Sequence, residues 1–414
     1  MSSQIKVGHT KLFKAVSLAL ILTSFVAATY GFGFYLFSVI VSDIRADLGF
    51  NYSTVGLITA SGQIGFLLFS FLGSLATPIL GGSQVVLGSA LLCGICLTAL
   101  SSASNVWQVA TLLTILGGCA ASVYVPMVEL VGRVVDFQNR GKVLGLISSG
   151  TSYGVFINGL TVPFFVTHLN WRYLWLFVGC LTLLAVVISF FAFSKLGLFK
   201  SLYEGGSKDN SGKAESLWKA SLSEATLLIW ILTFLNGFSL MPFQNYLAPY
   251  LREELNFSVS TTSQVWTLIG FIGMGAGFLI GALSDRIGIQ RSLFLSYVFI
   301  LVAAMILNIA PNSWSVLISG FCFAMAFYPI FGLIPAYLSK SSEIRNPTLV
   351  FGVANITLGL GGMLGNFLGG RSITLTGTFI WIYIAVSSVA LISLFLVSFL
   401  QDERSFKQDR KSVV

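Results

Sequence analysis

The chain has 414 residues, of which 55% are hydrophobic and only 9% are charged, whereas soluble domains carry about a quarter charged residues. No charged side chain occurs from Leu48 to Val128, and a water-soluble fold cannot bury so long an uncharged run, although a bilayer accepts it. The net charge of +8 comes from basic residues scattered over short segments, which indicates loops beside membrane helices and excludes a nucleic-acid-binding surface.

The N-terminal segment places three lysines, Lys6, Lys11 and Lys14, ahead of an uncharged stretch from Ala15 to Ser42. This stretch is longer than the apolar core of a secretory signal, and it lacks a small-residue cleavage site. We therefore expect it to be the first membrane-spanning helix.

Further along the chain, Gly, Pro, Ser, Asn and charged residues separate long apolar stretches. About 20 mostly apolar residues suffice for a helix to cross the hydrocarbon core. The predicted spans are 15–42, 53–76, 84–103, 106–130, 143–166, 173–194, 225–251, 261–283, 290–309, 313–338, 347–370 and 377–400. The sequence thus predicts an all-α membrane protein with twelve transmembrane helices.

The basic residues favour one orientation in the bilayer. With the N-terminus in the cytoplasm, 19 of the 23 Lys and Arg residues fall in cytoplasmic segments. The other four, Arg45, Arg172, Arg252 and Arg371, fall in outer loops, and none is left for the membrane interior. Because cytoplasmic loops carry an excess of Lys and Arg, we predict a multi-pass plasma-membrane protein with both termini cytoplasmic.

One hydrophilic stretch divides the spans into two groups of six. Its Gly, Ser, Asp and Asn residues are typical of a flexible linker. The predicted domains are an N-terminal six-helix bundle at 1–194, the cytoplasmic linker at 195–224, a C-terminal six-helix bundle at 225–400 and a cytoplasmic tail at 401–414.

The two groups of helices repeat each other in sequence. Matching residues recur at a near-constant offset: Gly62, Gly65 and Gly73 as Gly270, Gly273 and Gly281 at 208, Gly145 and Gly154 as Gly352 and Gly361 at 207, and Tyr30-Gly31-Phe32 as Asn236-Gly237-Phe238 at 206. This recurrence predicts two pseudo-symmetric bundles, and parallel repeats are a recurring transporter design with the solute site between the halves. Glycines on one helix face, such as Gly361 and Gly365, either pack statically or let the bundles rock.

A loop motif follows the eighth span. Gly281, Leu283, Asp285, Arg286, Gly288 and Arg291 have the spacing G-x-L-x-D-R-x-G-x-x-R. The motif resembles the loop signature of the major facilitator superfamily, and the resemblance covers the whole chain. The expected first copy, after the second span, has Thr77 and Pro78 in place of Asp and Arg.

Two further stretches are similar to this family. Residues 139–145 and 170–175 resemble a pattern of the branch that contains monocarboxylate porters and oxalate–formate exchangers. Gly154 is followed by Val155, so the Gly-Pro pair of drug exporters is missing, which argues against multidrug efflux.

The resemblance implies a transporter and not an enzyme. It implies secondary active or facilitated transport of a small organic solute across the plasma membrane by alternating access, without a cofactor, as a monomer, and with or without a co-transported proton. One alternative is an efflux exporter of small amphipathic compounds. Another is a non-transporting sensor on a transporter fold, which would be expected to carry a large cytoplasmic domain. A membrane-embedded enzyme would need clustered His, Asp or Glu residues within the spans.

Neutral polar and aromatic side chains near mid-depth are the candidate solute-binding residues. They are Tyr30, Gln63, Tyr124, Tyr153, Asn158, Asn236, Gln244, Trp266, Tyr328 and Asn355. Each could instead hydrogen-bond a neighbouring helix, because buried amides and phenols need partners. Since no Lys or Arg remains inside the spans to bind a buried anion, the set favours a neutral, zwitterionic or weakly acidic solute.

Charged residues near the helix ends are the candidates for coupling and gating. Glu129 either forms a helix-end ion pair with Arg133 or carries a proton during transport. The resemblance implies a gate made of Gly281, Asp285, Arg286, Arg291, Arg140 and Lys142. In that gate Asp285 would dock on the N-terminus of the helix that begins near Lys142, which attracts a carboxylate. The alternative is that Asp285 and Arg286 only solvate a loop.

Overall fold

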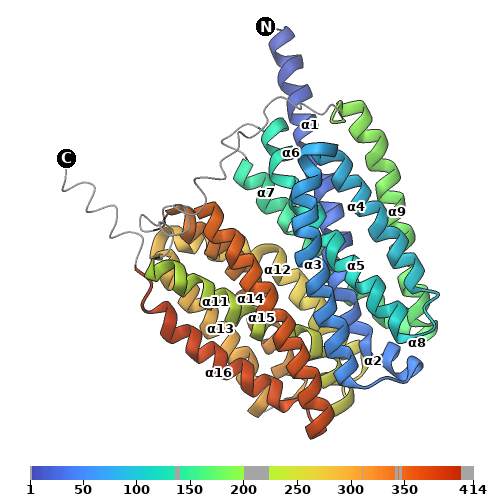
Figure 1. The fold of residues 1–414 in the computed structure, drawn as a ribbon, viewed down its shortest axis with the longest axis vertical. Helices are drawn as coiled ribbons and strands as arrows, with labels where there is room; N and C mark the ends of the chain where they lie inside the picture. The colour runs from blue at the N-terminus through green and yellow to red at the C-terminus, as the bar shows by residue number, and fades with distance from the viewer. Residues whose placement is uncertain are drawn as a thin grey trace, which may run out of the picture. The chain divides into compact units, whose positions relative to one another are not determined.

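A computed structural model of the chain describes residues 2–135, 140–199, 223–309, 311–340, 344 and 347–401. Every regular element within these residues is a helix (Figure 1). Twelve of the described helical stretches are long and apolar enough to cross a membrane, from Lys14–Leu48 to Ile380–Val397. The predicted all-α fold with twelve spans is therefore confirmed, and the two sets of boundaries differ by a few residues at most ends.

The N-terminal half contains ten described elements. They are α1 (Ser2–Val26), η1 (Ala27–Tyr35), α2 (Leu36–Leu48), α3 (Tyr52–Leu80), α4 (Gly82–Leu100), α5 (Val106–Tyr124), α6 (Met127–Val134), α7 (Arg140–Ser148), α8 (Gly150–His168) and α9 (Trp171–Leu196). The first span is interrupted by η1, which is a π-helix. The fourth predicted span is divided at Pro126, which precedes α6. Neither interruption is predicted by the hydropathy pattern.

The C-terminal half contains seven described elements. They are α11 (Glu224–Pro249), η4 (Tyr250–Glu254), α12 (Val259–Ile287), α13 (Ile289–Ile309), α14 (Ser313–Lys340), α15 (Pro347–Thr376) and α16 (Ile380–Val397). Most of the predicted linker and nearly all of the predicted tail lie outside the described residues.

The contacts divide the chain into two compact units. Unit 1 contains residues 1–50 and 61–206, and unit 2 contains residues 51–60 and 207–414. The division passes through α3, so the first turns of this helix pack with unit 2. There a Cβ added to Gly370 of α15 would lie 2.9 Å from the Cα of Gly56, and the Ser53 amide donates to the Thr374 hydroxyl at 2.9 Å. The two sequence repeats therefore do not coincide with the two packing units at α3.

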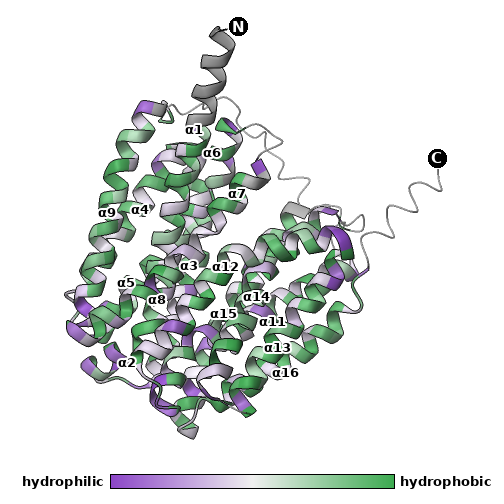
Figure 2. Ribbon diagram, turned by 180° about the vertical axis from the view of Figure 1, so that it is seen from behind, coloured by the Kyte–Doolittle hydropathy of each residue, from purple (hydrophilic) through white to green (hydrophobic). Residues whose placement is uncertain are grey.

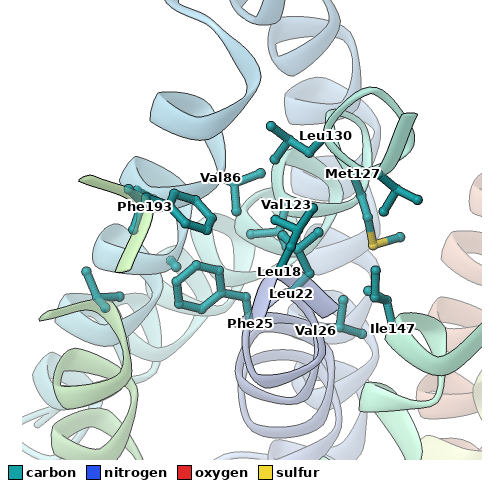
Figure 3. Close-up of a cluster of buried hydrophobic side chains, with 14 of the residues drawn as sticks. Leu18, Leu22, Phe25, Val26, Val86, Val123, Met127, Leu130, Ile147 and Phe193 are labelled. Atoms are coloured by element: carbon teal, nitrogen blue, oxygen red, sulfur yellow. The ribbon is translucent and has the colours of Figure 1, made fainter. Parts of the chain in front are cut away.

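The core of unit 1 surrounds α1. Figure 3 shows Leu18, Leu22 and Phe25 of α1 meeting apolar side chains of α4, α5, α6, α7 and α9. Leu18, Leu22 and Phe25 are all fully buried. Because dispersion contacts and not only water exclusion hold helices together in lipid, this close packing fixes α1 in the unit.

Many large apolar side chains lie on the outside of the helices. Phe278 is 80% exposed and Ile309 is 72% exposed, and Figure 2 shows hydrophobic residues along the helices with hydrophilic ones gathered toward helix ends. Trp107 and Trp314, each second in its helix, are both 78% exposed. Indole rings favour the membrane–water interface, so this surface suits a bilayer.

Each unit ties its first and last spans together at a helix end. In unit 1, Asp47 near the end of α2 accepts hydrogen bonds from the Trp171 indole at 3.2 Å and from the Arg172 guanidinium, both at the start of α9. In unit 2, Glu254 at the end of η4 accepts from the Thr378 hydroxyl and from the Phe379 amide, each at 2.6 Å. The hydrogen bonds to Asp47 give the Trp-Arg pair at the start of the sixth span a structural role.

Candidate functional site

The π-helix η1 is the main irregularity inside a span of unit 1. A π-helix has a wider turn than an α-helix and is frequently found at functional sites. Here it packs against α8 through glycines: a Cβ added to Gly31 would overlap the main chain of Gly154, and one added to Gly154 would lie 2.5 Å from the Ala27 carbonyl oxygen. Only glycines allow the two backbones to approach this closely.

A buried amide also joins α8 to η1. The Asn158 Nδ2 donates to the carbonyl oxygen of Gly31 at 2.7 Å, and the Asn158 side chain is fully buried. Its Oδ1 has no hydrogen-bond partner. Asn158 therefore supports the main chain of η1 and does not present its amide at a surface in this structure.

An aromatic cluster forms around Tyr30 of η1. We define it as Tyr30 and Phe34 of η1, Phe66 of α3 and Tyr124 of α5. The ring centroid of Tyr30 lies 6.3 Å from that of Phe66 and 6.2 Å from that of Tyr124, and the centroids of Phe34 and Phe66 are 6.4 Å apart, all edge to face. Edge-to-face rings at these separations attract one another.

The aromatic cluster is open on one side. Tyr124 is 40% exposed, and its hydroxyl lies 3.4 Å from the Ser148 hydroxyl at the end of α7. Tyr30 and Phe66 are partly buried. The cluster thus offers ring faces together with two adjacent hydroxyls, which can stack against a small molecule and hydrogen-bond to it.

Sequence reasoning selected Tyr30 and Tyr124 but missed Phe34 and Phe66. The signal for Phe34 was available, because it stands four residues after Tyr30 on the same stretch of helix. Phe66 lies on α3, which carries aromatic and aliphatic residues on every face. The sequence therefore does not show which neighbouring helix the Phe66 side chain contacts.

The other candidates in unit 1 lie in different environments. Gln63 of α3 is 5% exposed, and its Nε2 has no hydrogen-bond partner. Tyr153 of α8 is partly buried. Neither belongs to the aromatic cluster.

The candidates in unit 2 are mostly buried within it. Asn236, Gln244 and Trp266 are at most 3% exposed. Tyr328 is partly buried and lies over Gly273, where an added Cβ would overlap its ring. Asn355 donates to Phe351 in its own helix at 2.9 Å. The structure therefore does not bring these five side chains together as one exposed set.

Glu129 forms the helix-end ion pair that was one of the two expectations. Its carboxylate pairs with Arg133 one turn later on α6, and both side chains are partly exposed. The carboxylate also lies at the start of α4, since a Cβ added to Gly82 would be 3.3 Å from its Oε2. The N-terminus of α4 has no side-chain cap and attracts a negative charge.

Two of the gating candidates, Asp285 and Arg140, have partners within their own units. Asp285 pairs with Lys340 of α14 at 3.1 Å, and Arg140 donates to the carbonyls of Val135 and Gly132 at 3.1 and 2.6 Å. Arg140 thus caps the C-terminal end of α6. Arg286 and Arg291 are exposed, and Gly281 is half-buried with nothing within 4 Å of an added Cβ. The side chain of Lys142 lies outside the described residues.

Within the described part of the chain, no group of three or more His, Cys, Asp or Glu side chains is arranged to hold a metal ion.

Comparisons of the sequence with known proteins identify a family. The model of the Major Facilitator Superfamily matches residues 23–343. A putative metabolite transport protein of Haemophilus influenzae is 23% identical over 379 residues, covering 89% of this chain and 90% of that protein. The hexuronate transporter of Bacillus subtilis is 23% identical over 373 residues, covering 86% and 87%. The probable sulfoacetate transporter SauU of Cupriavidus necator is 22% identical over 295 residues, covering 67% and 68%.

A solved structure has a similar fold. A point variant of the nucleoside transporter NupG superposes with a TM-score of 0.74, covering 92% of this chain and 99% of that one at 14% identity. At this identity the likeness shows the fold alone.

Proposed function

Because this chain belongs to the Major Facilitator Superfamily and is a multi-pass membrane transporter of a small organic solute, we propose that its solute is neutral or zwitterionic and carries hydroxyl groups. The observation that supports this proposal is the aromatic cluster, with the Tyr124 and Ser148 hydroxyls beside its rings. Aromatic faces with a few polar groups bind small molecules of this kind.

The charges of unit 1 and unit 2 support the same solute class. Every Lys and Arg in the described residues lies outside the twelve spans or near an end of one of them. An anion held at mid-depth without a cation would cost several kcal/mol of desolvation. A weakly charged or uncharged solute avoids this cost.

A second solute class comes from the relatives. Two of them are named as transporters of hexuronate and of sulfoacetate, which are organic acids. A hexuronate also carries several hydroxyls, so the aromatic cluster would fit its ring, but the carboxylate would need a helix N-terminus or neutral donors.

Uptake into proteoliposomes decides between these classes. We expect the purified protein to take up radiolabelled D-glucose or a nucleoside faster than D-glucuronate or sulfoacetate. Tyr124→Ala should reduce uptake at least tenfold, because it removes a ring face and a hydroxyl, a loss of about 1.4 kcal/mol or more. Tyr173→Ala, at a 56% exposed tyrosine of α9, is the matched control and should leave uptake unchanged. Uptake of the organic acids alone would overturn the proposal.

We further propose that the protein acts as a monomer in a bacterial inner membrane with both termini cytoplasmic. The distribution of Lys and Arg supports this orientation. In a Cys-free background, an impermeant maleimide added to intact cells should label Thr376→Cys and spare Ser207→Cys. The opposite pattern would reverse the orientation.

We propose that Glu129 has a structural role. Its pairing with Arg133 and its position at the start of α4 account for its charge. A proton-carrying role is the alternative, and uptake by Glu129→Gln under a pH gradient separates the two.

A further inference from the structure

The two units contain the same helix contact at equivalent positions. In unit 1, Gly31 of η1 meets Gly154 of α8. In unit 2, Gly237 of α11 meets α15, where a Cβ added to Gly237 would overlap the Leu358 carbonyl oxygen and one added to Gly361 would overlap that of Phe234. Both contacts bring two backbones together through glycine.

The backbone at the two contacts differs. Residues 27–35 of unit 1 form a π-helix, whereas the equivalent part of unit 2 lies inside α11, an α-helix that continues from Glu224 to Pro249. The unit 2 contact is at least as close as the unit 1 contact. A glycine contact therefore does not by itself require a π-helix, and another feature of unit 1 must account for it.

The two contacts differ in the residue that follows the glycine one helical turn later. At the offset of 207 that pairs Gly154 with Gly361, the counterpart of Asn158 is Gly365, which has no side chain. Asn158 donates to the Gly31 carbonyl inside η1, whereas a Cβ added to Gly365 would lie 2.4 Å from the Phe238 carbonyl oxygen of α11. In unit 1 the side-chain bond thus reaches the main chain of the facing helix within the widened turns. A π-helix leaves main-chain groups displaced from the α-helical pattern, and a side-chain donor stabilises one of them.

Tyr30, the residue before Gly31, also differs in its surroundings from its counterpart in unit 2. Tyr30 is partly buried and contacts Phe66 and Tyr124 in the aromatic cluster. Its counterpart in the repeat, Asn236, is 1% exposed and faces Tyr297 of α13 inside unit 2. The same position of the repeat is therefore part of the aromatic cluster in unit 1, as Tyr30, and is buried inside unit 2, as Asn236.

We propose that Asn158 is a positioning residue: its hydrogen bond to the Gly31 carbonyl holds η1 in the π conformation and thereby sets the Tyr30 ring in the aromatic cluster. The role in transport rests on the proposed function, in which this cluster contacts the solute. Asn158 itself is fully buried.

A spectroscopic experiment tests the positioning independently of transport. 3-Fluorotyrosine is placed at position 30 alone in the full-length protein in nanodiscs, and its fluorine NMR spectrum is recorded. Asn158→Leu keeps the size of the side chain and removes the donor, so the resonance should shift or split. Thr161→Val is the matched control on the same helix, because the Thr161 hydroxyl bonds to Ile157 of α8 itself at 2.8 Å, and it should leave the resonance in place.

A second variant guards against a folding defect. Asn158→Ser is smaller, too short to reach the carbonyl, and should move the resonance in the same direction as Asn158→Leu. If properly folded protein of both variants gives the unchanged resonance, Asn158 does not position Tyr30 and the proposal is wrong. If neither variant folds while Thr161→Val does, Asn158 holds the unit together and the specific positioning of Tyr30 is likewise rejected.

Transport measurements complete the test. With D-glucose as the probe, Asn158→Leu should raise KM about fivefold to tenfold, the loss expected for one hydrogen bond, and leave kcat within about twofold. Combined with Tyr30→Phe, its effect should be much less than additive, because both changes act at one ring. A moved resonance together with uptake that is indifferent to Tyr30 would reject the proposed solute site and keep the positioning role.

Discussion

The two units connect equivalent helices through different side-chain contacts. Unit 1 joins its first and last spans through a charged pair, Asp47 with Arg172, whereas unit 2 uses the carboxylate of Glu254 on the start of α16. Unit 1 widens its first span into η1, and unit 2 keeps α11 regular at the same position. The repeat thus fixes where helices meet, while the side chains at each meeting point decide what the surface beside it can do.

The largest expected effect tests the shared glycine contacts. Gly237→Ala should lower the free energy of unfolding by about 3 kcal/mol, because the added methyl would overlap the Leu358 carbonyl oxygen. Gly31→Ala should cost less, about 1–2 kcal/mol, because the wider turns of η1 can yield. Gly277→Ala, with nothing within 4 Å of its added Cβ, is the control and should be neutral or slightly stabilising. Thermal unfolding followed by size-exclusion chromatography measures all three, and equal losses would contradict the contact geometry.

The ties between the first and last spans give the next effect. Glu254→Gln should cost about 1–2 kcal/mol, because it weakens two hydrogen bonds at the start of α16, one of them to a main-chain amide. Asp47→Asn should cost about 0.5–1 kcal/mol, because that pair is partly exposed and solvent screens it.

The effect of salt on stability should differ between the Asp47 contact of unit 1 and the Glu254 contact of unit 2. Raising the salt concentration should reduce the cost of Asp47→Asn and leave that of Glu254→Gln nearly unchanged. Thermal unfolding at low and high sodium chloride checks this difference. The same salt response in both variants would mean that the two units use the same kind of tie.

Composition and repetition were enough to predict the spans and to pair equivalent glycines of the two repeats, but not the contacts that these glycines make. Twelve apolar stretches marked the spans, and the near-constant offset paired Gly31 with Gly237 and Gly154 with Gly361. The π conformation of η1 was not predicted, because it depends on Asn158, which is 127 positions away from Gly31. The burial of Asn236 inside unit 2 was not predicted either, since α11 is apolar on all sides and gives no direction.

The division of α3 between the two units was not predicted from the sequence either. The Tyr52 hydroxyl donates to Glu253 at 2.5 Å, and the two residues are 201 positions apart. Hydropathy reports on the depth of a residue in the membrane and carries no information about which helix it contacts. A small residue such as Gly56 indicates that another helix can approach closely, but it does not show which helix that is.

A smaller effect is expected at Glu129 in unit 1. If its ion pair with Arg133 and its place at the start of α4 account for it, Glu129→Gln should lower stability by less than about 1 kcal/mol, since both side chains are partly exposed. Uptake driven by a pH gradient in proteoliposomes should persist at a similar rate. Loss of gradient-driven uptake with intact exchange of bound solute would instead make Glu129 the proton carrier.

The smallest effect on stability is expected where the two copies of the loop motif differ. In unit 1 the Thr77 hydroxyl bonds within its own helix, to Gly73 at 2.6 Å, whereas in unit 2 Asp285 pairs with Lys340. The side chains of Lys340 and Asp285 are 48% and 71% exposed, so water screens the pair and Asp285→Asn should change stability by less than about 0.5 kcal/mol.

Transport gives Asp285 a sharper test than stability does. If the motif acts in gating on one unit only, Asp285→Asn should slow turnover without raising KM, and Lys340→Gln should do the same, because each removes the same pair. Distances between spin labels at the helix ends near Asp285 and near Thr77 should then shift their populations in both variants. Because an exposed pair contributes little to folding, a change in these populations can only come from a difference in how the pair is made in the two transport states. Normal turnover with unchanged distances in both variants would leave Asp285 as a solvated loop residue, and the two copies of the motif would then be equivalent in function despite their different side chains.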